Sequence, residues 1–161
     1  MRDALGGVIN IQMILVFIAI VSGYLAFSVN YTKAFHVKNY IINKIEEYEG
    51  TGNNDAIDAI NQYMNKVGYS GPPSNSSPSI DCSSSQGASG RVVSSGSTRY
   101  GLCRFEGKPK TEKVNGRDVS TPRFYYKVVT YVNIDVPVIN QIMAGLDFFQ
   151  VSGETKLIEE T

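Results

Sequence analysis

Hydrophobic residues fill the first part of the chain almost without interruption. From Val8 to Val29 no side chain is ionised, and no charged residue occurs between Asp3 and Lys33. A helix over these 22 residues is about 33 Å long, which matches the ~30 Å hydrocarbon core of a bilayer. We therefore expect a membrane-spanning helix within residues 8–33.

Beyond this run the pattern becomes that of an amphipathic helix. Apolar residues recur at intervals of three and four, and most charged residues lie away from them, which predicts one buried face. The apolar stripe consists of Ala34, Val37, Ile41, Ile45 and Tyr48. Because Gly50 is a typical helix end, we predict one continuous helix from about residue 8 to residue 49.

A second, shorter helix is expected to pack on the first. Asn54 is a suitable N-cap and Gly68 a suitable end. The apolar face between them is formed by Ile57, Ile60, Met64 and Val67.

Alternating apolar and polar positions in the last third of the chain predict an antiparallel sheet. The expected elements are a strand at 100–105, a hairpin turn at Asn115-Gly116, a long half-buried strand at 124–135, a short helix at 138–143, and a final strand within 148–158 that is kinked at Ser152-Gly153. The predicted fold class is α+β, with the long N-terminal helix packed on the C-terminal sheet.

Two cysteines flank part of a serine-rich segment between Tyr69 and Arg99, which we expect to be a surface loop. If the chain is exported, Cys82 and Cys103 would meet an oxidising compartment and form a disulfide. Closing a loop of this size would stabilise the fold by about 3 kcal/mol. The alternative is a pair of buried free thiols.

Small residues in the apolar run form two spaced pairs, Ala19-x-x-x-Gly23 and Ser22-x-x-x-Ala26. Such pairs allow two helix backbones to approach closely in an apolar environment. Glycine and alanine are also common in membrane helices, so the pairs by themselves leave both interpretations open.

The leader Met1-Arg2-Asp3-Ala4-Leu5-Gly6-Gly7, followed by the apolar run and a continuous helix, resembles the type IV pilin-like family. That family includes pseudopilins and the minor subunits of tight-adherence pili. The resemblance implies cleavage after Gly7 by a prepilin-peptidase-like protease, with Val8 as the first mature residue. The resulting division is a leader at 1–7, a transmembrane or filament-core helix at 8–33, and an extracytoplasmic domain at 34–161.

Gln12 departs from the family pattern. It is the fifth residue counted from Val8, where the family usually has a glutamate that pairs with the amino terminus of a neighbouring subunit. A glutamine has the same shape but no charge, so it replaces that ion pair only in part. A specialised or minor subunit is one explanation; an interfacial amide in an ordinary membrane helix is the other.

The resemblance implies a structural subunit of a type IV pilus-like or tight-adherence pilus-like filament, with other pilin-like subunits, the membrane and an assembly machinery as partners. The apolar helices of many copies would bundle into the filament core, with Gln12, Ala19, Ser22, Gly23 and Ala26 at the contacts. The alternative is a single-pass, membrane-anchored binding domain that does not polymerise.

The sequence offers no pattern typical of an enzyme. The chain has 15 basic and 15 acidic residues, which gives no electrostatic reason to expect nucleic-acid binding. Its single histidine, His36, has no cysteine or carboxylate at metal-ligand spacing. We expect no catalytic residues, metal or cofactor. Tyr125, Tyr126 and Tyr131 fit either a contact surface or, more simply, a half-buried strand.

Overall fold

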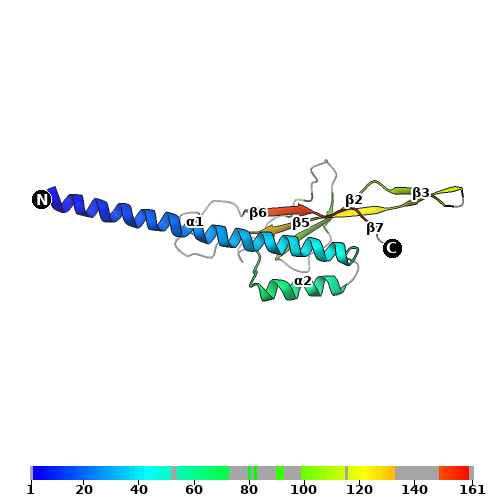
Figure 1. Ribbon diagram of the computed structural model, residues 1–161, viewed down its shortest axis with the longest axis horizontal. Helices are drawn as coiled ribbons and strands as arrows, with labels where there is room; N and C mark the ends of the chain where they lie inside the picture. Colours follow the sequence, from blue (N-terminus) through cyan, green and yellow to red (C-terminus); the bar gives the residue numbers. More distant parts are fainter. Residues whose placement is uncertain are drawn as a thin grey trace.

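The computed structural model describes residues 2–51, 54–72, 80, 82, 90–92, 99–114, 116–132 and 149–159, with the backbone alone at residues 2–8, 91, 92 and 114. A long helix lies along an antiparallel sheet, and the N-terminal half of this helix projects beyond it (Figure 1). The fold class is α+β, as the sequence predicts.

The long helix α1 spans Arg2–Glu47, 46 residues, and is about 69 Å long at the standard rise. It begins earlier than expected, because residues 2–7 continue the same helix without a break. At its other end the chain reverses through positive φ values at Glu49 (53°) and Gly50 (130°). The amide of Gly50 donates a hydrogen bond to the carbonyl of Ile45 at 2.9 Å, which completes the helix end.

Helix α2, Asn54–Lys66, runs back antiparallel to α1 (Figure 1). Ile60 and Met64 are fully buried as predicted, Ala56 joins them, and Ile57 and Val67 are only half-buried. The ring of Tyr63 stacks on that of Tyr40 in α1, with 3.8 Å between the centroids. The two helices therefore form one layer against the sheet.

The main sheet has five antiparallel strands. They are β1 (Arg91–Val92), β2 (Tyr100–Glu106), β5 (Arg123–Tyr131), β6 (Gln150–Glu154) and β7 (Ile158–Glu159). Their order is β1-β2-β5-β6, and β7 also pairs with β5. Strands β3 (Lys110–Val114) and β4 (Arg117–Thr121) form a separate hairpin that extends from the end of the sheet farthest from the N-terminus (Figure 1).

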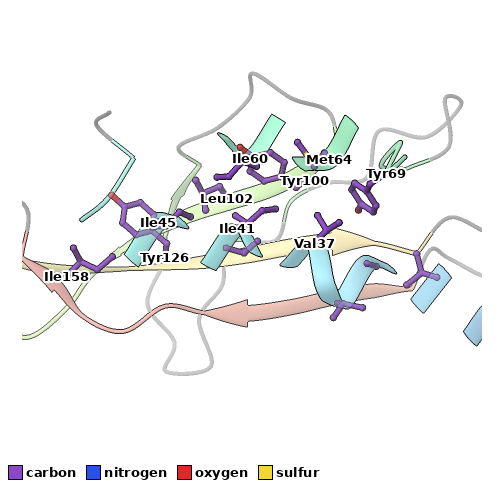
Figure 2. Packing of buried hydrophobic residues seen from close by; sticks show 14 residues of the cluster. Val37, Ile41, Ile45, Ile60, Met64, Tyr69, Tyr100, Leu102, Tyr126 and Ile158 are labelled. Atoms are coloured by element: carbon purple, nitrogen blue, oxygen red, sulfur yellow. The ribbon is translucent and has the colours of Figure 1, made fainter. Parts of the chain in front are cut away.

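The hydrophobic core lies between the amphipathic half of α1 and the sheet (Figure 2). From α1, the predicted stripe residues Val37, Ile41 and Ile45 are fully buried. They pack among Leu102 of β2 and Tyr126 of β5 in one cluster. Full burial of each such side chain contributes roughly 1.5–3 kcal/mol, so this stripe fixes α1 on the sheet.

Polar contacts hold the two ends of this packing. The buried hydroxyl of Thr130 lies 3.1 Å from the carbonyl oxygen of Ala34 in α1 and 3.2 Å from that of Val151 in β6, and its proton serves one at a time. Near the end of α1, the carboxylate of Glu46 accepts a hydrogen bond from the amide of Lys156 at 2.9 Å. Helix and sheet are thus joined at both ends of the stripe.

The kink predicted at Ser152-Gly153 is wrong. Strand β6 pairs with β5 through both residues, Ser152 opposite Val129 and Gly153 opposite Val128. The strand ends later, at Glu154. At Thr155 the side-chain hydroxyl, and not the backbone carbonyl, accepts the hydrogen bond from the amide of Tyr126 at 2.9 Å. Gly153 serves a different purpose: a Cβ there would lie 2.9 Å from Cδ1 of Ile42, so the missing side chain lets α1 approach β6.

Strand β5 is less exposed than the predicted half-buried strand. Val129 and Tyr131 are as buried as Tyr126 and Val128 on the opposite face. The face away from α1 is covered in part by Ile80, which lies so close to Gly101 that a Cβ there would be 3.0 Å from it. Tyr125 stacks on Phe105 with 5.0 Å between centroids. The tyrosines therefore pack within the domain.

The predicted helix at 138–143 and the predicted strand residues 133–135 and 148 lie outside the described residues.

Tyr69 links the end of α2 to the end of β5. Its hydroxyl accepts a hydrogen bond from the amide of Tyr131 at 2.7 Å and donates one to the carbonyl of the same residue at 3.0 Å. Burial raises the pKa of Tyr69 to about 12. The folded state therefore favours the protonated phenol.

We predict that Tyr69→Phe lowers the free energy of unfolding of the full chain in detergent by about 1–3 kcal/mol, because a buried amide and carbonyl lose their partner. In the wild type, Tyr69 contributes stability that is present below pH 10, the ordinary pKa of the unfolded residue, and is lost as the pH rises towards 12. Denaturant unfolding measured across this range should show a shallower alkaline loss in the variant. Tyr48→Phe, beyond the end of α1, is the control; an equal effect there would contradict the assignment.

Candidate functional site

The N-terminal half of α1 exposes its apolar side chains all round. Every described side chain from Ile9 to Ser22 is exposed, for example Phe17 at 67% and Leu15 at 61%. The most apolar stretch of the helix buries none of its length within the protein. A continuous apolar surface of this kind marks a membrane or protein contact. One helix of the described chain, near the N-terminus, is therefore long and apolar enough to cross a membrane.

The proposed cleavage and assembly residues all lie on this helix. Gly7 and Val8 are consecutive residues of α1, with no break in the backbone between them. Gln12, Ala19 and Ser22 are exposed on the projecting half. These residues therefore all lie on the projecting N-terminal half of α1, which we call the rod (Figure 1).

Gly23 and Ala26 lie where the rod meets the domain, and both are half-buried. At about 100° per residue, Gly23 is in line with the stripe that packs on the sheet further along. Ala19 and Ala26 lie about 45–65° to one side of this line, and Ser22 lies about a quarter turn away on the same side. The small residues thus continue the packing face of α1 into its exposed half.

The globular part of the molecule reaches α1 at Phe27, within the predicted 8–33 segment. The rings of Phe27 and Phe149 meet edge to face with 5.1 Å between centroids. One turn later Asn30 is half-buried, and its side-chain amide donates to the carbonyl of Ala26 at 3.0 Å. A second helix that approaches along the Gly23 face therefore has free access only up to this aromatic contact.

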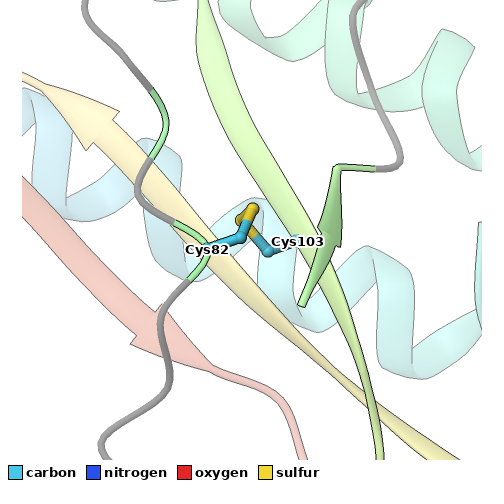
Figure 3. The surroundings of a disulfide bond; sticks show 2 residues. All are labelled: Cys82 and Cys103. Atoms are coloured by element: carbon cyan, nitrogen blue, oxygen red, sulfur yellow. A yellow bond between two sulfur atoms is a disulfide. The ribbon is translucent and has the colours of Figure 1, made fainter. Parts of the chain in front are cut away.

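The predicted disulfide is present between Cys82 and Cys103, whose Cα atoms are 5.5 Å apart (Figure 3). Cys103 lies in β2 next to Leu102, so alternation places it on the face of the sheet away from α1. The amide of Gly90 donates to the carbonyl of Cys82 at 2.8 Å, which brings the chain back towards β1. The disulfide therefore holds Cys82 on the outer face of the sheet.

A small pocket of about 170 Å³ opens beside α1 where the rod enters the domain. It is lined by Asn30, Lys33, Gly68, Tyr69, Ser70, Gly71 and Tyr131. The sequence alone does not predict this pocket, since no local pattern relates Lys33 to the turn after α2. The only signal was the pair of glycines around that turn, both of which adopt positive φ, 62° at Gly68 and 82° at Gly71.

His36 is exposed and lies beside the ring of Phe35, 6.4 Å between centroids. Within the described ranges, no three histidine, cysteine or acidic side chains gather as metal ligands.

No family model, curated protein or solved structure matches the chain.

We predict that replacing both cysteines, in Cys82→Ala/Cys103→Ala, lowers the free energy of unfolding by about 3 kcal/mol, because the unfolded chain regains the freedom of the closed loop. Chemical denaturation of the full chain in detergent, with and without a reductant, measures this. Reductant should destabilise the wild type and leave the double variant unchanged. Two titratable thiols in protein isolated from the oxidising side of a membrane would contradict the disulfide.

Proposed function

We propose that the chain is a non-enzymatic structural subunit of a type IV pilus-like or tight-adherence pilus-like filament, held in a membrane by α1 before assembly. The observation that carries the proposal is the contrast between the two halves of α1. The second half is buried against the chain's own sheet, whereas the first half exposes apolar side chains on all sides. A rod with these properties requires apolar surroundings from elsewhere.

Two environments supply such surroundings to the same rod. Before assembly, the hydrocarbon core of a bilayer matches the length of residues 8–29. After assembly, the corresponding rods of neighbouring subunits replace the lipid, with small residues such as Ala19 and Gly23 allowing close approach. The same surface can thus serve as anchor and as filament core.

The disulfide supports an exported position for the domain. Disulfides persist in oxidising compartments and are rare in the cytosol. With the domain exported, the leader at residues 1–7 is on the cytoplasmic side, where a prepilin-peptidase-like protease would act. Export, membrane anchoring and cell-surface assembly then form one sequence of events.

The amide at Gln12 favours a specialised or minor role within such a filament. It offers hydrogen bonds to the amino terminus of a neighbouring subunit but no compensating charge. The same uncharged residue is the observation that favours the second candidate, a single-pass, membrane-anchored extracytoplasmic binding domain that does not polymerise.

Intact-mass measurement of the mature protein distinguishes these two functions. We expect a mature chain that begins at Val8, and Gly7→Leu should leave the leader attached because a bulky residue occupies the cleavage position. The variant should keep its unfolding transition, since Gly7 lies far along α1 from the core. A wild-type chain that retains Met1 to Gly7, together with cells that display no fibres of this protein, would favour the binding domain.

We predict that Gly23→Leu reduces filaments severalfold without lowering the amount of subunit in the membrane, because the added side chain keeps neighbouring helices apart. Electron microscopy counts the filaments, and membrane fractionation measures the subunit pool. Val21→Leu, on the opposite face of α1, is the matched control. Equal loss in both variants would show that the Gly23 face has no special part in assembly.

A further inference from the structure

The end of the domain that faces the N-terminal rod carries lysines and a polar pocket, close to the point where the rod enters the domain. Between Asp3 and Glu46 the chain has no acidic residue, but it has Lys33 and Lys38. A third lysine, Lys44, lies near the other end of α1 and pairs with Glu47 there at 2.6 Å. If the apolar rod spans a bilayer as proposed above, Lys33 lies about one helical turn beyond the membrane boundary at Val29. The domain itself already contacts α1 at Phe27. The rod-facing end of the domain is therefore level with the lipid headgroups.

The pocket at this level has the composition expected of an anion site. Lys33 and Asn30 of α1 form one wall and the turn at residues 68–71 the other. Lys33 is half-buried, and no ion pair joins it to a carboxylate in the part of the chain that the structure describes. A volume of about 170 Å³ equals that of several water molecules at roughly 30 Å³ each, which is enough for a phosphate group.

Contacts with neighbouring elements hold the turn at residues 68–71 in place beside the pocket. Gly71 is buried, and a Cβ there would lie 2.5 Å from Cα of Arg99, so the turn passes directly against the chain that enters β2. The guanidinium of Arg99 donates to the side chain of Asn65 in α2 at 2.6 Å. Tyr69 fixes the turn to β5 from inside. Three separate elements thus hold the pocket wall in place.

Within the domain, the acidic residues of both helices lie towards the end away from the rod, and a lysine of each lies towards the end near it. Lys66 is in the last turn of α2, and the antiparallel path of α2 returns it towards the rod (Figure 1). The acidic residues of the helical layer lie at the opposite end: Glu46, Glu47, Glu49, Asp55 and Asp58. Exposed tyrosines, Tyr24 and Tyr31, flank the boundary, as is typical of residues at a membrane interface. An anionic surface below the domain would attract this end and repel the other.

We propose that the pocket beside Lys33 binds the phosphate of an anionic phospholipid headgroup while the subunit is in the membrane. Lys33 supplies the charge, the 68–71 turn encloses the phosphate, and Lys66 adds attraction to the surrounding surface. The bound lipid holds the domain upright on the membrane until assembly withdraws the rod. This explains why lysines follow the span on the side to be exported, where the positive-inside rule does not place them. The inference rests on the membrane position proposed above.

Native mass spectrometry of the full chain, released from detergent micelles that contain equal parts of phosphatidylglycerol and phosphatidylcholine, tests the proposal. We expect preferential retention of one phosphatidylglycerol. Lys33→Gln should weaken its binding about five-fold, the effect of one cation near an anionic surface, and Lys33→Arg should retain it. Lys108→Gln, the same change of charge in the exposed link between β2 and β3, is the matched control and should bind like the wild type.

Other outcomes overturn the proposal in distinguishable ways. Equal retention of the two lipids, or equal loss in Lys33→Gln and Lys108→Gln, would show that the pocket does not select a headgroup. Displacement of the lipid by inorganic phosphate, with phosphate itself retained by the protein, would assign the pocket to a free anion. A full chain that stays soluble without detergent would refute the membrane position, and with it the proposed function; a chain that requires detergent but binds both lipids equally would refute only this inference.

Discussion

The structure depends on the burial of one stripe of α1 against the sheet. Val37 and Ile41 are completely enclosed, and they pack on β2 and β5 in a single cluster. Because α1 continues as one helix from Arg2 to Glu47, fixing its second half also fixes the direction of its first half. A rigid apolar rod then projects from the domain. Its exposed apolar surface favours a membrane or a bundle of like helices as its surroundings.

The sheet has two covered faces with different partners. One face packs against α1 and α2, and Ile80 and the Cys82–Cys103 disulfide lie on the other. Gly101 and Gly153 permit these approaches on opposite faces, since a Cβ at either position would come within about 3 Å of Ile80 or Ile42. The disulfide on the outer face and the apolar packing on the inner face together stabilise a small sheet, which supports the rod.

The boundary between rod and domain combines three properties that are separate in the sequence. The Phe27–Phe149 contact sets how far the domain reaches along α1, Lys33 brings charge to that level, and the turn closed by Tyr69 shapes a pocket beside it. If the proposed function is right, these features would lie at the headgroups in a membrane, and between the packed core and the solvent-facing layer in a filament. The boundary is thus the place where the two states of the subunit would differ most.

The sequence by itself determined the features that repeat along the chain. The uncharged run from Val8 to Val29, the three-and-four spacing from Ala34 to Ile45 and the Asn115-Gly116 turn identified the long helix and a hairpin, because each depends on neighbouring residues alone. Only the tertiary structure decided which residues meet across the fold. Contacts between residues distant in sequence, such as Tyr69 with Tyr131 and Tyr126 with Thr155, shape three features. These are the pocket at Lys33, the burial of β5 on both faces, and the end of β6 beyond Ser152-Gly153. Periodicity carries no information about such pairs.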